Sequence, residues 1–284
     1  MALSRIKRSD YTVVKGLGQG SFGSTFLVSE NSTGKYIAWK RITIINEDHR
    51  RMAQAEADML SRLKNEFLVK FIGTFEEESE FYILMEYCDK GDLRKYLNNL
   101  KEMGAAVTED KLWDLFAQMT EAVHSLHSQN IIHRDLKPEN VFLTEKFQIK
   151  LGDLGMARIS VSRTSFQTRI AGTIEYFPPE LQKIQLNDDD EDEQGSKQQN
   201  CIAQQTKETD MFALGEMFYE MITLRHPFAN KKGIVLQPLI LKCKPDPLPQ
   251  NVSESMKQIV MQMIQLVDHL LKNYQPNVRY SKDY

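Results

Sequence analysis

The stretch from His133 to Asn140, HRDLKPEN, gathers acidic, basic, amide and imidazole side chains within eight positions. A further carboxylate, Asp153, follows thirteen residues after Asn140, within the sequence GDLG. Runs of charged residues are commonly solvated surfaces, so the residue types alone do not indicate chemistry. The question is whether the intervening chain brings Asp135, Asn140 and Asp153 to one point.

The residues between Asn140 and Asp153 predict a short hairpin, with strands at Val141–Leu143 and Phe147–Leu151. Because the hairpin is antiparallel, the residue that enters it and the residue that leaves it lie side by side. Amide and carboxylate oxygens suit Mg²⁺, which binds through few protein groups together with phosphates. We therefore expect a magnesium site here, with Asp135 beside it as the base or orienting group for an attacking hydroxyl.

A glycine cluster, Gly18, Gly20 and Gly23 in GQGSFG, separates two expected strands, Tyr11–Leu17 and Thr25–Ser29. A dinucleotide-binding fingerprint requires a helix after the glycines, and here a strand follows, so that interpretation fails. A glycine-rich hairpin lying over phosphates remains, because missing side chains let backbone N–H groups approach an anion.

Lys40 lies in an expected strand, Lys35–Ile42, where it shares a face with Ala38 while Trp39 points to the other face. A lysine beside a small alanine could form the floor of a nucleotide pocket and reach its phosphates. Taken alone, however, Lys40 is more simply explained as an exposed lysine on an edge strand.

Glu56 favours the first interpretation of Lys40. It lies in an expected helix, Asp48–Leu63, four residues after Met52 and four before Leu60, and so shares their inward face. A carboxylate on an apolar face needs a partner, because burial of an unpaired charge costs several kcal/mol or more. We expect one ion pair, between Lys40 and Glu56, to hold this helix against the sheet.

Composition indicates a globular chain without a distinctive partner. Of the 284 residues, 41% are hydrophobic and 26% charged, which is ordinary for a soluble protein. The net charge of −3 includes six acids within 188–193, so its overall sign identifies no partner, and no concentrated basic face suggests nucleic acid. Three widely spaced cysteines, without a CxxC pair, fit a reducing compartment. The start lacks a signal peptide and no apolar run is long enough for a membrane span, so we expect a cytoplasmic or nuclear protein.

The pattern along the chain changes from strands to helices. Two more strands are expected at Val69–Phe75 and Phe81–Tyr87, and mostly helical patterns follow. The later helices are predicted at Met211–Ile222 and Ser255–Leu271. A long earlier helix has the apolar stripe Leu112, Leu115, Met119, Val123 and Leu126.

Taken in order, these motifs closely resemble a eukaryotic protein kinase. The matching stretches are GQGSFG, IAWK, the helix glutamate, HRDLKPEN, DLG, PPE and TDMFALG. The resemblance implies an α+β fold of two lobes, with a kinase domain at 11–284 that follows a short extension, 1–10. The implied lobes are a small β-rich one at 11–87 and a larger helical one at 88–284, which carries a disordered acidic insertion at about 183–207.

The resemblance also implies a binding site for ATP. The residues that it assigns to ATP are Gly18, Gly20 and Gly23 over the phosphates, Lys40 on the α- and β-phosphates, Thr25, Ala38 and Phe142 around adenine, Met85 as gatekeeper, Glu86 and Cys88 in the hinge, and Asp153 beside the phosphates.

The same resemblance assigns catalytic roles. Asp135 would accept or orient the proton of the substrate hydroxyl, and Lys137 would lie near the γ-phosphate. Glu56 would orient Lys40, while Asn140 and Asp153 would bind Mg²⁺.

The kinase class follows from narrower similarities. DLKPEN, with Lys137, resembles the serine/threonine group, and the stretches YCDKGDLRKYL, NVFLTEKFQIKLGDLGMAR and TSFQTRIAGT are similar to the NIMA-related (Nek) kinases. The resemblance implies protein substrates phosphorylated on Ser or Thr. It also implies regulation through the segment 153–180, by an upstream kinase or by autophosphorylation.

One departure concerns that regulation. In related kinases the arginine at the position of Arg134 usually receives a phosphate carried by the activation segment. The phosphorylated residue is often a threonine four positions before the one that corresponds to Thr173. Here this position is Arg169. We hypothesise that Thr168 or Ser165 takes the role; the alternative is that Arg169, or no phosphate, sets the loop.

Two other function classes stay open. A pseudokinase scaffold would bind partners without turnover, but such proteins typically lose at least one of Lys40, Glu56, Asp135, Asn140 and Asp153, all present here. A small-molecule phosphotransferase of similar fold would not be expected to carry GTIEYFPPE, which resembles a peptide-docking segment. The acidic run within the insertion is either a docking site for basic partners or a solvated loop.

Overall fold

The structure, a computed structural model, describes residues 6–20, 23–159, 172–182 and 205–273. The expected phosphorylation sites, Thr168 and Ser165, and the acidic run 188–193 lie outside these residues. The chain divides into two compact units, each made of three segments: Met1–Leu93, Ala117–Ser128 and Glu139–Gly155 in the first, and Arg94–Phe116, Gln129–Pro138 and Met156–Tyr284 in the second. The expected division into lobes after residue 87 follows sequence order alone and stays a prediction.

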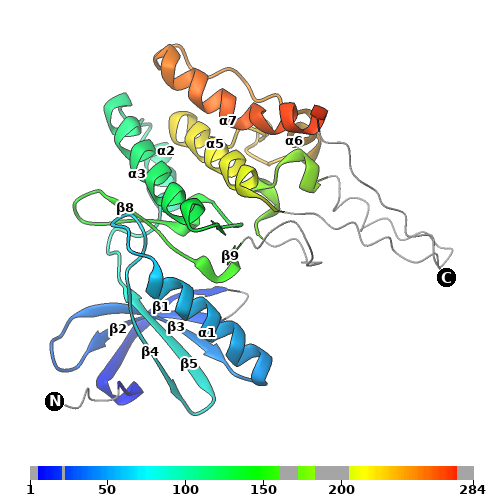
Figure 1. The fold of residues 1–284 in the computed structure, drawn as a ribbon. Helices are drawn as coiled ribbons and strands as arrows, with labels where there is room; N and C mark the ends of the chain where they lie inside the picture. Colours follow the sequence, from blue (N-terminus) through cyan, green and yellow to red (C-terminus); the bar gives the residue numbers. More distant parts are fainter. Residues whose placement is uncertain (1–5, 21–22, 160–171, 183–204, 274–284) are drawn as a thin grey trace, which may run out of the picture. The chain divides into compact units, whose positions relative to one another are not determined.

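The first unit is built on a five-stranded antiparallel sheet (Figure 1). All five strands that the sequence predicts are present, with ends shifted by three residues or fewer. In spatial order the strands are β1 (Tyr11–Gly20), β2 (Gly23–Glu30), β3 (Tyr36–Thr43), β5 (Glu80–Glu86) and β4 (Phe71–Glu77).

An aromatic cluster covers one face of this sheet. Trp39 is buried, with its ring centroid 5.0 Å from that of Tyr82 and 5.9 Å from that of Phe75. Phe75 and Tyr82 stack at 4.4 Å, and Ile6, from the short N-terminal extension, packs against the cluster. Because successive strand residues alternate between faces, Ala38 and Lys40 then lie on the opposite face, as the sequence predicts.

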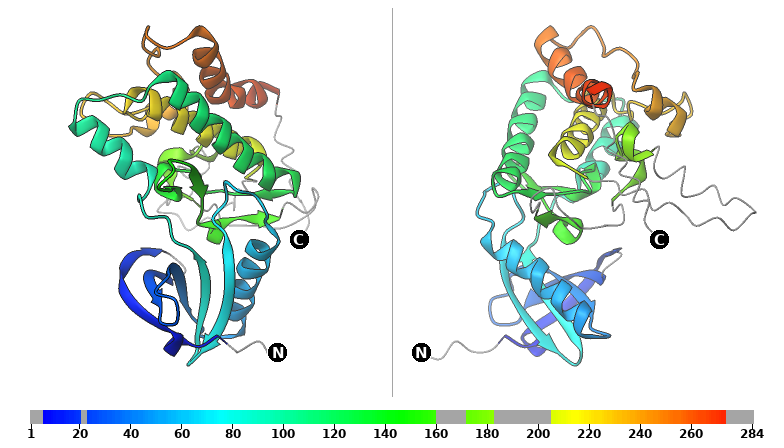
Figure 2. Two further views of the ribbon diagram at one scale, coloured as in Figure 1. Left: turned by 90° about the vertical axis from the view of Figure 1, so that its left-hand side faces the viewer. Right: turned by 45° about the vertical axis from the view of Figure 1, so that its right-hand side comes forward.

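Helix α1 (Glu47–Arg62) lies along the sheet beside β4 and β5 (Figures 1 and 2). It begins at Asn46, whose side chain accepts a hydrogen bond from the backbone N–H of His49 at 2.9 Å, a typical N-cap. Its buried residues are Ala53, Ala57 and Leu60.

The prediction that Met52 lies on the inward face of α1 is wrong, because its side chain is 51% exposed. Ala53 and Ala57 occupy the centre of that face instead. Glu56 lies beside them, and its side chain is largely buried. Small alanines let the helix approach the sheet closely, and Met52 falls one position beyond the contact.

Later in the sequence than the sheet, the hairpin of β7 (Val141–Leu143) and β8 (Ile149–Leu151) completes the first unit. β8 begins two residues later than predicted, because Phe147 adopts a positive φ of 61° in the turn. Gln118, on helix α3 (Glu109–Ser128), accepts a hydrogen bond from the N–H of Ile149 at 2.9 Å. The whole predicted apolar stripe of α3 is buried.

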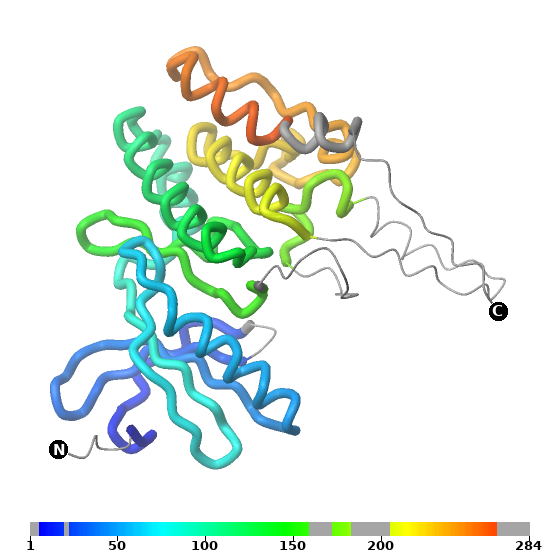
Figure 3. Tube along the Cα trace, viewed as in Figure 1, coloured from blue at the N-terminus to red at the C-terminus, as the bar shows by residue number. Residues whose placement is uncertain are grey.

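The second unit is mostly helical. Its described helices include nearly all of α2 (Leu93–Glu102), the first part of α3, and α5 (Lys207–Thr223), α6 (Gln237–Lys242) and α7 (Glu254–Asn273). Helix α5 is buried along most of its length, and α7 runs beside it (Figure 3). Phe116 of α3 stacks on Phe218 of α5, with ring centroids 3.7 Å apart. The short strands β6 (Ile131–Ile132) and β9 (Arg158–Ile159) pair in an antiparallel ladder. The α+β class predicted from the sequence is confirmed.

Residues 205–207, counted within the polar segment predicted as a disordered insertion, are described by the structure: Thr206 is the N-cap of α5 and Lys207 is its first residue. Gln205 is buried, and the N–H of Thr206 donates to the hydroxyl of Thr209 in a capping arrangement. The polar composition of this stretch reflects helix capping and a buried hydrogen bond at its end.

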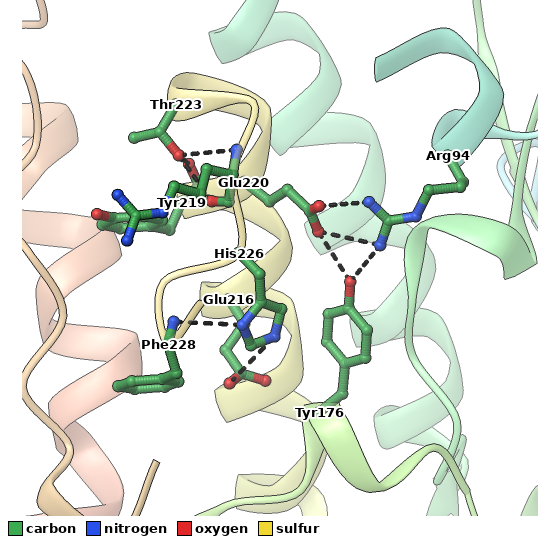
Figure 4. Close-up of polar contacts among 9 residues, drawn as sticks. Arg94, Tyr176, Glu216, Tyr219, Glu220, Thr223, His226 and Phe228 are labelled. Atoms are coloured by element: carbon green, nitrogen blue, oxygen red, sulfur yellow. Dashed lines mark hydrogen bonds and ion pairs between the residues drawn. The ribbon is translucent and has the colours of Figure 1, made fainter. Parts of the chain in front are cut away.

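Glu216 is the least expected residue in the core of α5. Its side chain is fully buried, and neither carboxylate oxygen has a hydrogen-bond partner among the described residues. The nearest cationic candidate is His226, whose Nε2 lies 3.8 Å away (Figure 4). Burial, together with the neighbouring charge of Glu220, raises the pKa of Glu216 well above 4.5. Burial, with the nearby charge of Arg94, lowers the pKa of His226 to about 3.

None of the described helices is long and apolar enough to cross a membrane.

Replacing Trp39 tests the aromatic cluster. We expect Trp39→Ala to lower the free energy of unfolding by about 3–5 kcal/mol, because a large buried side chain is removed and a cavity remains. Trp39→Phe should cost clearly less, since the indole N–H of Trp39 has no acceptor among the described residues and no hydrogen bond is lost. Urea denaturation compares the variants; equal destabilisation by both would contradict this account.

Replacing Glu216 by glutamine tests its protonation. The folded state holds the Glu216 proton more tightly than the unfolded state, so stability is lost as pH rises from about 4.5 through the folded pKa. Glu216→Gln should therefore be stabilised relative to wild type at pH 8 and show a flatter stability profile between pH 5 and 8. Glu208→Gln, an exposed residue of the same helix, is the control in thermal unfolding. An unchanged profile in Glu216→Gln would show that the carboxyl is not held protonated.

Candidate active site

The predicted ion pair between Lys40 and Glu56 is confirmed. Lys40 Nζ lies 2.7 Å from Glu56 Oε1, and the two side chains are only 9% and 11% exposed. β3 supplies the lysine and α1 supplies the glutamate. Such a buried pair holds its two elements together, because separating them would leave an uncompensated charge.

Asp153 approaches the same ammonium group. Its Oδ1 lies 3.8 Å from Lys40 Nζ, and its side chain is 48% exposed. Gly155 passes so close that a Cβ on it would lie 2.7 Å from Lys40 Nζ. Gly155 thus leaves the space that the Lys40 ammonium occupies between Glu56 and Asp153.

The hairpin brings Asn140 next to the residues that precede Asp153. Val141 pairs with Leu151, and the N–H of Gly152 donates to the carbonyl of Asn140 at 2.9 Å. The strand pairing therefore brings Asn140 and the residue before Asp153 side by side, as the sequence predicts. An amide oxygen and a half-exposed carboxylate form a donor set that fits Mg²⁺. Asp135 belongs to the other compact unit, and its place beside these two ligands stays a prediction.

The residues predicted around adenine lie on neighbouring strands of the first unit. Ala38 pairs with Met85 across β3 and β5, and Thr25 pairs with Lys40 across β2 and β3. Phe142 lies against Gly152, where a Cβ would come within 2.9 Å of its ring. Glycine at position 152 therefore lets the Phe142 ring pack directly against the backbone.

The hinge residues are held by the sheet and the hairpin. Glu86 Oε1 lies 2.9 Å from Lys150 Nζ and accepts the N–H of Lys70 at 2.7 Å. Its backbone N–H donates to the carbonyl of Lys70 at 2.9 Å, so both this N–H and the side chain are engaged within the protein. Cys88 is buried, and burial followed by the charge of Glu86 raises the pKa of its thiol to about 12.

The glycines of the first hairpin serve different purposes. Gly20 pairs with Gly23 at the end of β1 and β2, and Gly18 pairs with Thr25. A Cβ on Gly18 would meet no atom within 4 Å, so at that position the glycine keeps space open. Gly23 has a φ of 148°, and a Cβ there would lie 2.1 Å from the carbonyl oxygen of Arg41. The backbone itself therefore requires glycine at position 23.

In the second unit, Asp135 is held by two side chains. Lys137 Nζ lies 2.8 Å from its Oδ2, and the hydroxyl of Thr173 donates to its Oδ1 at 2.7 Å. Lys137 also donates to the hydroxyl of Thr173 at 2.6 Å. The sequence motifs did not assign Thr173 a role; its place directly after Gly172, at the end of the activation segment, was the available signal.

The backbone of the loop that carries Asp135 is fixed by Asp210 of α5. The carboxylate of Asp210 accepts the N–H groups of His133 and Arg134 at 2.8 and 2.9 Å. Arg134 adopts a positive φ of 71°, which costs energy in a residue with a side chain. Gly172 packs against it, since a Cβ there would lie 2.2 Å from the carbonyl oxygen of Arg134.

The Arg134 side chain, expected to receive a phosphate, is buried. Its Nε donates to Gln205 Oε1 at 2.6 Å. Burial, followed by the positive charge of Arg158, lowers the pKa of the Arg134 guanidinium to about 10. Arg158 therefore places a second positive charge near the Arg134 guanidinium.

The segment after Thr173 is anchored to α5 by a network of polar contacts (Figure 4). The Tyr176 hydroxyl donates to Glu220 Oε2 at 2.8 Å and accepts from Arg94 at 2.6 Å. Arg94 also pairs with Glu220. Since Tyr176 follows Thr173 by three residues, this network fixes the chain next to the hydroxyl that contacts Asp135.

Comparison with known proteins identifies the family. Residues 11–281 match the family model described as the protein kinase domain. The chain is 34% identical over 258 residues to serine/threonine-protein kinase Nek3 of Mus musculus, covering 90% of this chain and 46% of that protein. It is 31% identical over 262 residues to serine/threonine-protein kinase Nek5 of Homo sapiens, covering 90% of this chain and 34% of that protein.

A third relative, serine/threonine-protein kinase Nek1 of Mus musculus, is 32% identical over 257 residues, which make up 89% of this chain and 20% of that protein. The chain thus spans less than half the length of these relatives. The predicted resemblance to NIMA-related serine/threonine kinases and the predicted kinase fold are confirmed. With the family model matching nearly its whole length, the chain belongs to the protein kinase domain family.

Proposed function

We propose that this protein is an ATP-dependent protein serine/threonine kinase, which transfers the γ-phosphoryl group of ATP to hydroxyl groups of protein substrates. The observation that carries the proposal is the buried contact of Lys40 with Glu56, with Asp153 approaching the same ammonium. The Lys40 side chain is only 9% exposed, whereas the Asp153 carboxylate beside it is 48% exposed and can also contact a ligand. This arrangement suits a polyanionic ligand.

The residues proposed to bind ATP and its metal belong to the first unit. Protein kinases generally use ATP and Mg²⁺. Lys40, oriented by Glu56, would contact the phosphates, and Asn140 with Asp153 would hold the metal. When bound, magnesium would neutralise charge on the phosphate oxygens. The glycines Gly18 and Gly20 would leave backbone N–H groups accessible to the phosphates.

Asp135 is the proposed acceptor of the hydroxyl proton. The Lys137 ammonium and the Thr173 hydroxyl hold its two oxygens in a defined orientation. Lys137 also supplies positive charge next to the reacting hydroxyl, where negative charge develops. Catalysis would then depend on positioning and electrostatics, as phosphoryl transfer generally does.

The proposal extends to regulation and location. We propose control through the segment 153–180, by an upstream kinase or by autophosphorylation at Thr168 or Ser165. We also propose a cytoplasmic or nuclear location, without a membrane or nucleic-acid partner. The buried Arg134, with Arg158 near it, supports an anion-sensitive segment.

The first test measures transfer of phosphate from labelled ATP with Mg²⁺ to generic protein substrates, for wild type and Asp153→Ala. We expect transfer to Ser and Thr by wild type, and a loss of roughly 10²–10³-fold in the variant, because a proposed ligand of the Mg²⁺ that would neutralise charge on the phosphates is removed. A Mg²⁺-dependent thermal shift with ATP but no transfer would instead indicate a nucleotide-binding scaffold. Phosphate found on tyrosine would overturn the proposed specificity.

Asp135→Asn tests the proposed proton acceptor. Turnover should fall roughly 10²–10⁴-fold, because the amide cannot take the proton in the transition state. The KM for ATP should change little, since the proposed phosphate contacts come from Lys40 and the metal ligands. Asp110→Asn, an exposed residue at the start of α3, serves as the control. Near-wild-type turnover in Asp135→Asn would remove Asp135 from the mechanism.

A further inference from the structure

Gln205 lies at the start of α5 and contacts the loop that carries Asp135. Its side chain is buried, and its Oε1 accepts a hydrogen bond from Arg134 Nε at 2.6 Å. A distance this short, between two buried groups, indicates a strong charge-assisted hydrogen bond. Residue 205 is separated from residue 134 by 71 positions, so only the tertiary structure creates this contact.

Besides its contact with Gln205, Arg134 is bound by a second residue. Asp210, one turn further along α5, accepts the backbone N–H groups of His133 and Arg134. Arg134 is therefore held at its backbone by Asp210 and at its side chain by Gln205. Asp210 lies in the first part of the buried helix α5, Gln205 directly precedes the N-cap of that helix, and Asp135 is the residue after Arg134.

Because Arg134 is buried and another positive charge lies near it, the Gln205 oxygen stabilises the guanidinium by accepting its hydrogen bond. A buried guanidinium that loses an acceptor pays the full cost of its lost hydration. Arg158 lies close enough to disfavour the charged form further, and Asp210 is the acid that opposes this effect. Its carboxylate also accepts the two backbone N–H groups of the loop. The amide oxygen of Gln205 thus adds a side-chain acceptor to the backbone contacts that Asp210 makes.

We propose that Gln205 is a positioning residue for phosphoryl transfer: it fixes the Arg134 side chain and, through it, the conformation of the loop that places Asp135. This inference rests on the proposed kinase function. Gln205 is part of the polypeptide, so this acceptor is present whatever the phosphorylation state of the chain. Gln205 thereby supports the loop independently of any anion that Arg134 and Arg158 also bind.

Three variants separate this role from simple stabilisation. Gln205→Leu removes the acceptor at similar size, and Gln205→Glu keeps an acceptor oxygen. Lys207→Met is the matched control, because Lys207 also starts α5 and loses only an exposed contact to Asn130, 3.2 Å long. All proteins are treated with phosphatase beforehand, so that no phosphate substitutes for the glutamine.

Steady-state kinetics should show a fall in kcat of roughly ten- to a hundredfold for Gln205→Leu, since small displacements of a catalytic group have effects of this size. The KM for ATP should stay within about twofold, as expected when the interaction lost acts on the transition state. Gln205→Glu and Lys207→Met should both stay within about threefold of the wild-type kcat. An unchanged kcat in Gln205→Leu, or an equal fall in Gln205→Glu, would overturn the proposal.

A second measurement does not depend on activity. Hydrogen exchange of the Arg134 Nε–H, followed by NMR, should be slow in wild type and Gln205→Glu and fast in Gln205→Leu. If wild type transfers no phosphate even without phosphatase treatment, the proposed kinase function fails, and this signal alone then decides whether Gln205 holds Arg134. Equal protection in all variants would show that Gln205 does not hold it.

Discussion

A charged side chain can be buried only where another charge or a set of hydrogen bonds replaces its lost hydration. In the first unit this constraint is met at Lys40, whose ammonium lies 2.7 Å from Glu56. Because the two residues come from β3 and α1, the same contact fixes the helix against the sheet and the direction of the lysine. Asp153 approaches the ammonium from a third segment, and Gly155 leaves the space that this approach needs. One buried charge therefore organises three segments of the proposed ATP site.

The second unit meets the same constraint with a buried acid. Asp210 accepts hydrogen bonds from two backbone N–H groups, which belong to His133 and Arg134. The pairing lets α5 hold a loop that includes a residue of positive φ, a conformation that local preferences would not maintain. The loop that carries Asp135 is thus held by a buried aspartate that contacts the residue directly before Asp135.

Glu216 shows what happens when burial provides no such compensation. Its nearest cationic candidate, His226, lies 3.8 Å away and has its own pKa lowered by burial. The carboxyl then avoids the cost of its charge by holding a proton, and its pKa rises. The contrast with Glu220 on the same helix is direct, because Glu220 pairs with Arg94 and accepts the Tyr176 hydroxyl. Similar residues, one turn apart, differ because one has partners within reach.

The sequence by itself determined the features that depend on local pattern. Period-two and helical spacing predicted the five strands and the buried stripe of α3, and the antiparallel hairpin placed Asn140 beside the residues before Asp153. Only the tertiary structure decided the exposure of Met52 and the roles of Thr173 and Gln205. Those depend on how closely a helix approaches a sheet, and on contacts with residues 38 and 71 positions away. Periodicity describes one element at a time, whereas such contacts depend on the directions of side chains from elements that the chain brings together only when folded.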